Sequence, residues 1–172
     1  MDSYIQLAKK TIEEYIKTSK VINPPPDLPP EMHREKAGVF VSLHKKSDHS
    51  LRGCIGTFLP TKKNIAEEII SNAISAAFKD PRFTPITEQE LTDLEINVDV
   101  LSRPEPITDI KQLDPEKYGL LVKNQLGRSG LLLPDIGVKT AEEQISICCQ
   151  KGGIDPKNNN IQLFRFTVER HK

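Results

Sequence analysis

The stretch Leu51-Arg52-Gly53-Cys54-Ile55-Gly56 combines two glycines, a cationic side chain and a thiol. It follows Gly38 to His44, where apolar and polar side chains alternate as in a strand with one buried face. Residues 45–50, between the two stretches, are polar and typical of a turn. We therefore expect an antiparallel hairpin, and the period of two residues predicts that Arg52 and Cys54 are neighbours on one of its faces.

Two amphipathic helices are predicted on either side of this hairpin. Apolar side chains recur at helical spacing over residues 3–20 and again over residues 64–79. In the second helix, Asn64 and Glu67 have the spacing of a capping box. The proline-rich residues 23–30 exclude both helix and inner strand, so we expect an extended strap, with an SH3-type ligand motif as the functional alternative.

The second half of the chain shows the same kinds of pattern. Its strands occur in hairpins and are interrupted by helices without regular βαβ alternation, which indicates an α+β fold with a mostly antiparallel sheet flanked by helices. The expected elements are strands at 94–101, 119–122 and 130–133, a polar connection at 107–117, a helix from Thr140 to Gly152 and Gly153, and one last strand at 161–169.

Composition limits the class of protein. The 172 residues suit one domain, residues 1–172, that can bury its own core. Lys and Arg (24) balance Asp and Glu (24), so no global charge attracts nucleic acid or anionic lipid. The three cysteines lack CxxC spacing, which argues against a disulfide framework or structural zinc. Without a leader pattern or a membrane-length apolar run, the sequence predicts a soluble, cytoplasmic protein.

Cys54 is the leading candidate for chemistry. A thiolate is a strong nucleophile, and a neighbouring cation such as Arg52 stabilises it. Gly53 and Gly56 would admit a ligand close to the backbone or form a β-bulge that re-aims the thiol. The alternative is that Cys54 is a small buried side chain in a crowded site. His44, on the preceding strand, is the candidate general base.

Other polar residues carry two interpretations each. Asp80 and Arg82 would orient an anionic or polar ligand, with Phe83 as an apolar wall, or they would form a local ion pair. Cys54 and Cys148 with a histidine would make a zinc site, although no spacing calls for one, and Cys148 and Cys149 are interpreted as structural. One face of the strand at 94–101 offers either acid–base and metal-ligand oxygens or a solvated surface: Glu95, Asn97 and Asp99.

The motifs resemble the AMMECR family, named after a chromosomal region associated with Alport syndrome, and in particular its microbial branch, AmmeMemoRadiSam system protein A. The family signature LRGCIG stands unchanged at 51–56, and the resemblance covers essentially the whole chain. The other motifs that are similar, in order, are Asp80-Pro81-Arg82-Phe83 and residues 94–102, 127–134 and 165–171.

The resemblance implies an α+β fold with a large and a small subdomain and a cleft between them. It implies no established reaction and leaves the cofactor unknown. The partners it implies are a Memo-like protein, related to extradiol dioxygenases, and a radical S-adenosylmethionine enzyme. The residues expected to line the ligand cleft are Leu51, Arg52, Gly53, Cys54, Ile55, Gly56, Asp80, Arg82 and Phe83.

Two classes of function follow. The first is an intracellular enzyme, or enzyme subunit, of a modification or small-molecule pathway, with Cys54 as nucleophile and Arg52 as its electrostatic support. The second is a non-catalytic module that binds a peptide or partner surface, with Cys54 only packing, and the lack of an obvious base favours it. A nucleic-acid-associated regulator is a third class, but the zero net charge gives it no support. The sequence leaves the oligomeric state open.

Overall fold

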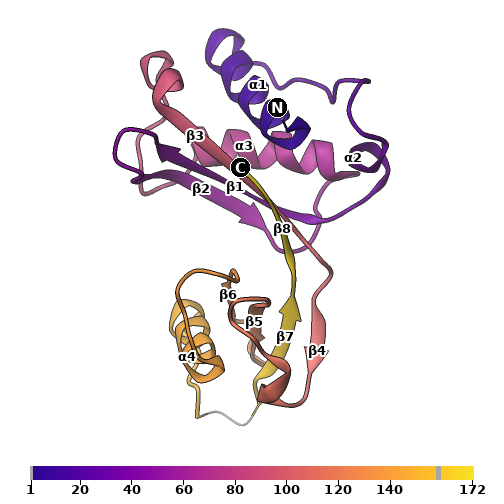
Figure 1. The fold of residues 1–172 in the computed structure, drawn as a ribbon, viewed down its shortest axis with the longest axis vertical. Coiled ribbons are helices and arrows are strands. Elements are labelled where there is room, and N and C mark those ends of the chain that lie inside the picture. The colour runs from indigo at the N-terminus through magenta and orange to yellow at the C-terminus, as the bar shows by residue number, and fades with distance from the viewer. Residues whose placement is uncertain (1, 158–159) are drawn as a thin grey trace. The chain divides into compact units, whose positions relative to one another are not determined.

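The computed structural model describes residues 2–157 and 160–172, and the chain divides into two compact units (Figure 1). Unit 1 consists of Met1–Leu101 and Glu169–Lys172, and unit 2 of Ser102–Val168. Each unit has its own four-stranded sheet. Among the described residues, none of the helices has the length and apolar character needed to span a bilayer.

The sheet of unit 1 has the strand order β2-β1-β3-β8. β1 (Gly38–Lys45) pairs antiparallel with both β2 (Leu51–Thr57) and β3 (Leu94–Leu101). β8 (Val168–His171) lies beside β3 and forms the other edge. The predicted hairpin is therefore confirmed as the β1–β2 half of this sheet.

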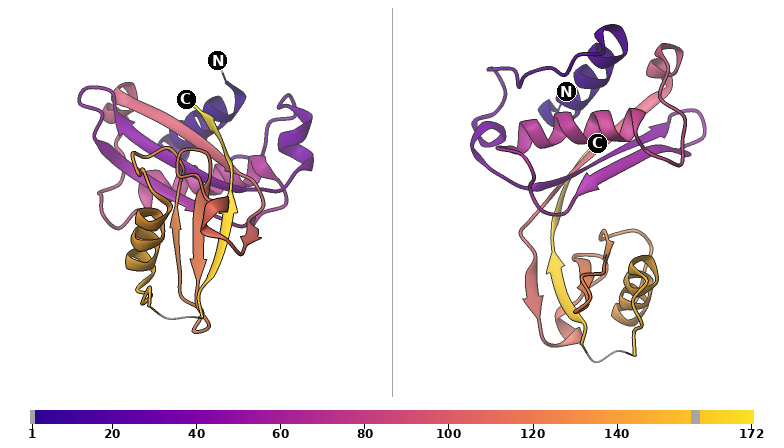
Figure 2. Two further views of the ribbon diagram at one scale, coloured as in Figure 1. Left: turned by 60° about the horizontal axis from the view of Figure 1, so that its bottom comes forward. Right: turned by 180° about the vertical axis from the view of Figure 1, so that it is seen from behind.

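Helices α1 (Ser3–Thr18) and α3 (Ile65–Phe78) cover one face of this sheet (Figure 2). The alternation predicted for β1 is confirmed, because its apolar residues are fully buried against these helices. The cap at Asn64 is also confirmed, since its side chain accepts a hydrogen bond from the Glu67 N–H. The strap ends in an unpredicted short helix, α2 (Pro30–Arg34), because proline is tolerated in a first helical turn.

Unit 2 has the strand order β4-β7-β5-β6. Its strands are β4 (Glu105–Ile107), β5 (Gly119–Lys123), β6 (Ser129–Leu132) and β7 (Gln162–Phe166), all paired antiparallel. Helix α4 (Ala141–Gly152) packs on one face of this sheet and buries Cys148 and Cys149 (Figure 1). The predicted α+β class, with antiparallel sheets flanked by helices, is confirmed.

Two expectations need correction. The last strand is two strands, β7 and β8, which belong to different sheets and are separated at Thr167. There Thr167 exchanges hydrogen bonds with Ser102, at the point where the chain passes between the two sheets. The segment after β3 is also less irregular than expected: β4 lies just before the predicted connection at 107–117, with Pro106 tolerated on this edge strand, and the connection itself contains the short helix η2 (Ile110–Gln112).

Candidate functional site

Cys54 lies in the middle of β2, the outer strand of the unit 1 sheet. Its register partner on β1 is Ser42, and the Ser42 Oγ lies 3.2 Å from the Cys54 Sγ. The adjacent pair, Val41 and Ile55, faces the core, so Cys54 points to the opposite face. The partly buried thiol therefore lies on the face of the sheet that α1 and α3 do not cover.

The loop after α3 holds the backbone of Cys54. An oxygen of Asp80, Oδ2, accepts a hydrogen bond from the Cys54 N–H at 3.0 Å. Arg82 Nη2 donates to the Cys54 carbonyl oxygen at 3.3 Å. Because β2 is an edge strand, these two contacts occupy backbone groups that would otherwise be open to a further strand. The loop at residues 80–82 therefore contacts the 51–56 motif through the backbone of Cys54.

Asp80 and Arg82 form a tight local pair. Arg82 Nε and Nη2 donate to the two Asp80 oxygens at 3.0 and 2.8 Å. The pair is unequally buried, with 2% of the Asp80 side chain exposed against 56% of the Arg82 side chain. The hydrogen bonds from Arg82 hold the pKa of Asp80 well below its usual range despite burial. The same contact raises the pKa of Arg82 and leaves an exposed cation beside Cys54.

Phe83 helps to fix this cation. The Arg82 guanidinium carbon lies 5.4 Å from the centroid of the Phe83 ring, within the range of a cation–π contact. The Phe83 N–H donates to the Asp80 carbonyl oxygen, which closes the turn after α3. The structure therefore brings Cys54, Asp80, Arg82 and Phe83 together, as the sequence suggested.

Arg52 is engaged elsewhere. Its Nε lies 2.7 Å from Glu90 Oε1 and its Nη2 lies 3.2 Å from Glu90 Oε2. Its Nη1 donates to the Thr84 carbonyl oxygen at 2.8 Å, and Nη2 also reaches the Pro85 carbonyl oxygen at 3.4 Å. The hydrogen bonds from Arg52 lower the pKa of Glu90 to about 2. Arg52 therefore ties β2 to the segment from Thr84 to Glu90.

The expectation that Arg52 and Cys54 share one face is wrong. The β1–β2 register shifts between Leu43 and His44, so that Leu43 pairs with Gly53 and His44 pairs with Leu51. Arg52 is thus the extra residue of a β-bulge, and strict alternation fails at this point. Among the described residues, no hydrogen bond or ion pair joins Arg52 to Cys54.

The two glycines of the motif are explained by packing within the chain. A Cβ at Gly53 would lie 2.2 Å from the Ala76 carbonyl oxygen of α3. A Cβ at Gly56 would lie 2.2 Å from the Phe40 ring. Ile55 packs against the core of unit 1, and Leu51 is 37% exposed opposite His44. The motif therefore contributes to the architecture of the sheet as well as to the surroundings of Cys54.

The expected general base is not in place. The register sets His44 opposite Leu51, not opposite Cys54. Within residues 2–157 and 160–172, the side chain that hydrogen-bonds to the thiol is Ser42, and no histidine or carboxylate does so. The same residues contain no cluster of three or more His, Cys, Asp or Glu side chains that would hold a metal ion. Burial raises the pKa of Cys148 to about 12 and also raises that of Cys149.

The polar face of β3 is only partly solvated. Asp99 is buried, and its carboxylate lies 2.8 Å from Arg170 Nε of β8. Asn97 is the register partner of Ser42, so Cys54, Ser42 and Asn97 form a row across three strands. The Asn97 Oδ1 is buried and has no hydrogen-bond partner among residues 2–157 and 160–172, which is unusual for a polar atom and leaves an acceptor in this row.

Sequence reasoning missed two residues of this site, Ser42 and Glu90, and named Asn97 only as part of the polar face of β3. Thr87 and Glu90 have the same spacing as the caps predicted at 64 and 140, and they do form a capping box at the start of the short helix η1 (Glu88–Asp93). That signal was available for Glu90. The positions of Ser42 opposite Cys54 and of Asn97 opposite Ser42 depend on strand register, for which the sequence carries no comparable local signal.

Comparison with known proteins assigns the family. The family model named AMMECR1 matches residues 5–171. A Thermotoga maritima protein is 52% identical over 170 residues, covering 98% of this chain and 97% of that protein. A Clostridium acetobutylicum protein is 47% identical over 174 residues, covering 99% of this chain but only 36% of that longer protein. The crystal structure of an uncharacterised Pyrococcus horikoshii protein is similar with a TM-score of 0.88 at 37% identity, over 97% of this chain and 88% of that one. The chain therefore belongs to the AMMECR1 family.

Proposed function

We propose that this chain is an enzyme, or a subunit of an enzyme, in which the thiol of Cys54 is the reacting group. The reaction class is thiol-dependent transfer or hydrolysis on an anionic or polar substrate. The observation that carries the proposal is that three polar groups contact Cys54. The buried Asp80 carboxylate and the exposed Arg82 guanidinium bind its backbone, and the Ser42 hydroxyl lies at its sulfur. Such grouping is typical of sites where chemistry depends on fixed geometry.

Each neighbour of Cys54 has a role in this proposal. Asp80 fixes the backbone of the nucleophile through the Cys54 N–H. Arg82 supplies positive charge for an anionic substrate, because its hydrogen bonds to described residues use Nε and Nη2 and leave Nη1 available. Ser42 places its hydroxyl oxygen 3.2 Å from the sulfur of the nucleophile.

Arg52 acts through other residues in this proposal and does not contact the substrate. Its guanidinium is tied to Glu90 and to two backbone carbonyl oxygens of the segment that follows residues 80–83. It is therefore a positioning residue, and the charge that supports the thiol comes from Arg82. This differs from the role that the order of residues in the motif suggests for Arg52.

The second candidate is a non-catalytic binding module with Cys54 as a packing residue. It is favoured by the thiol's hydrogen-bond contacts, which within the described residues include Ser42 but no histidine or carboxylate. In that case the exposed Arg82 would recognise an anionic or polar segment of a partner protein.

We further propose that the chain works in the cytoplasm with a Memo-like protein and a radical S-adenosylmethionine enzyme. The support for these partners is the family resemblance of the sequence motifs. Affinity purification of the tagged chain from its own cells tests this proposal. Co-elution of the Memo-like protein or the radical enzyme supports the assembly, and elution of the chain without either contradicts it.

Alkylation tests the role of Cys54. We expect iodoacetamide to modify Cys54 faster in the folded protein than in the urea-unfolded protein at the same pH, with the site assigned by peptide mass. Cys148 and Cys149 are internal controls, because both are buried and should react only after unfolding. Cys54→Ser confirms the assignment. If Cys54 instead reacts faster after unfolding, it is a packing residue and the binding module is the better description.

A further inference from the structure

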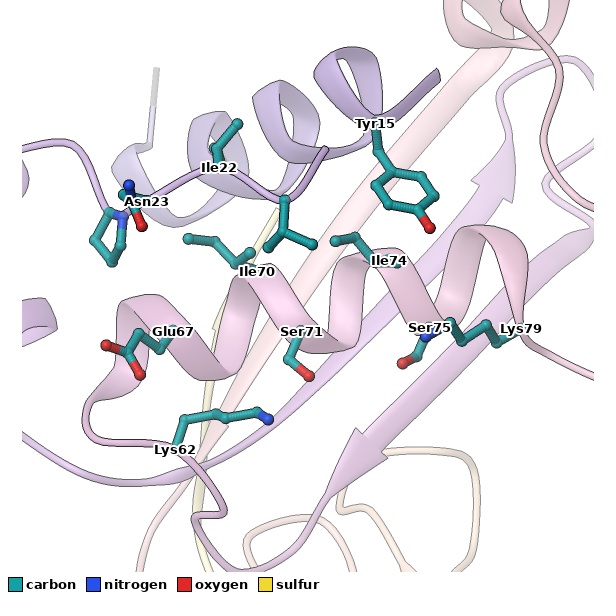
Figure 3. A pocket seen from close by; sticks show the side chains of 12 residues that line it. Tyr15, Ile22, Asn23, Lys62, Glu67, Ile70, Ser71, Ile74, Ser75 and Lys79 are labelled. Atoms are coloured by element: carbon teal, nitrogen blue, oxygen red, sulfur yellow. The ribbon is translucent and has the colours of Figure 1, made fainter. Parts of the chain in front are cut away.

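A second site lies in unit 1 and shares no residue with the Cys54 site. An open pocket of about 370 Å³ lies between the end of α1, the strap and α3 (Figure 3). This volume falls within the range of about 300–1,000 Å³ that is usual for small-molecule pockets. The pocket is lined by Tyr15, residues 21–24, Lys62, one side of α3 from Glu67 to Ser75, and Lys79, the residue that follows α3.

One wall is polar. Glu67, Ser71, Ser75 and Lys79 follow each other at intervals of four residues, so they form one row along α3. Lys62 extends toward Ser71, and the Glu67 carboxylate is directed away from it (Figure 3). The two serine hydroxyls therefore lie between two lysines.

The other wall is apolar. Ile70 and Ile74 form the neighbouring row of α3, and Val21 and Ile22, which precede the strap, also line the pocket. Of these side chains, Val21 is 63% exposed. The pocket thus offers an apolar surface directly beside a polar row.

The walls are fixed before any ligand binds. The Tyr15 ring packs against Phe78, with 4.9 Å between ring centroids, which holds the end of α1 against α3. The Lys62 N–H donates to the fully buried Glu68 carboxylate, which also accepts from Thr61 and Thr57. Preorganised walls reduce the entropy lost on binding.

The charges select the ligand. Lys62 and Lys79 are exposed, and within residues 2–157 and 160–172 no carboxylate forms an ion pair with either ammonium group. Glu67 is the one carboxylate among the residues that line the pocket. The lining therefore carries a net positive charge around two hydroxyl donors, beside an apolar wall.

We propose that this pocket binds a small amphiphilic carboxylate. The carboxylate accepts hydrogen bonds from Ser71 and Ser75 between the Lys62 and Lys79 ammonium groups. The apolar body of the ligand packs on Ile70 and Ile74 and covers the exposed Val21. The assignment does not depend on the chemistry of Cys54.

Titration of the full chain with three eight-carbon probes tests the assignment. Octanoate, octan-1-ol and octan-1-amine share one apolar body and differ in the charge of the head group. We expect octanoate to bind at least about tenfold more tightly than the alcohol, with the amine weakest, and to shift the amide resonances of residues 21–24 and α3. The assignment is overturned if octanoate does not bind, or if the amine binds as well as octanoate.

Charge reversal gives a matched control. Lys62→Glu and Lys79→Glu together should weaken octanoate binding about tenfold, because two attractive contacts become repulsive. Lys63→Glu should leave the affinity unchanged, since Lys63 is exposed next to Lys62 but does not line the pocket. If Lys63→Glu weakened octanoate binding as much as the double substitution, the assignment would be overturned. All three lysines are exposed, so the variants should fold, and their far-UV circular dichroism verifies this.

Discussion

Two arginine–carboxylate pairs contact or include residues of the 51–56 motif, and the buried partner is the arginine in one pair and the carboxylate in the other. In the Arg52–Glu90 pair the guanidinium is the buried partner, with 9% of its side chain exposed against 30% for Glu90. In the Asp80–Arg82 pair the carboxylate is buried, with 2% exposed against 56% for Arg82. A buried charge must be satisfied by the chain itself, whereas an exposed partner can be reached by a ligand.

This difference separates structural from ligand-binding roles. Arg52 is hydrogen-bonded to Glu90 and to the carbonyl oxygens of Thr84 and Pro85, so its role is structural. The contact with Asp80 holds the Arg82 guanidinium beside Cys54, and more than half of the Arg82 side chain remains exposed. The arginine within the motif therefore builds the site, and the arginine outside the motif faces the ligand.

Removal of the buried carboxylate should have the largest effect. Asp80→Ala should lower the free energy of unfolding by about 3 kcal/mol, because Asp80 accepts hydrogen bonds from the Cys54 N–H and from Arg82. Urea unfolding measures the loss. Asp27→Ala, at an exposed position, is the control and should change stability by no more than about 0.5 kcal/mol. A loss at Asp80 as small as the control would mean that the 80–82 loop does not hold β2.

Removal of the buried guanidinium should have the next largest effect. Arg52→Ala should lower the free energy of unfolding by about 2 kcal/mol, since Glu90 and the Thr84 carbonyl oxygen lose their hydrogen bonds from the guanidinium. Arg52→Lys should recover little, because an ammonium group cannot reproduce the bidentate contact. The exposed Arg103→Ala is the matched control. Full recovery with lysine would show that charge alone matters at this position.

Acid should weaken the Arg52–Glu90 contact. The folded-state pKa of Glu90 is about 2, below the ordinary value of 4.5, so its contribution is complete above about pH 5 and is lost as the pH falls toward 2. Between about pH 5 and 2, the free energy of unfolding should therefore fall by about 1–2 kcal/mol less in Glu90→Gln than in the wild type. Urea unfolding at several pH values measures this difference. Glu142→Gln, at an exposed position, serves as control. The same decline in wild type and Glu90→Gln would contradict the account.

The exposed arginine should matter least for stability. Arg82→Gln should cost about 1 kcal/mol, because glutamine can still donate to Asp80 and the backbone donors to that carboxylate remain. Urea unfolding of Arg82→Gln and Asp80→Ala under the same conditions compares their losses in the free energy of unfolding. A cost equal to that of Asp80→Ala would show that Arg82 is as structural as its partner.

The local parts of the fold could be predicted from the sequence. The caps at Asn64 and Thr140, the alternation of β1 and the limits of β3 depend on residues close in the chain, and the structure confirms them. The grouping of Asp80, Arg82 and Phe83 in one loop was also predictable, because Pro81 ends the preceding helix.

The remaining features depend on pairing between distant segments. The bulge that redirects Arg52 is a property of the register between β1 and β2, and it inverts a prediction made from alternation alone. The division of the last strand at Thr167 follows from its contact with Ser102, which is far away in the sequence. For the same reason, the partners of Cys54 on neighbouring strands could not be identified in advance.

The most direct test of this division of roles is the charge selectivity of Cys54. Iodoacetate and iodoacetamide are similar in size, but only the first is an anion, so the ratio of their alkylation rates reports positive charge beside the thiol. We expect Arg82→Gln to lower this ratio about fivefold, as loss of roughly 1 kcal/mol of attraction would. Arg34→Gln, at an exposed position in α2, should leave the ratio unchanged. An unchanged ratio in Arg82→Gln would contradict the claim that Arg82 faces the ligand at Cys54.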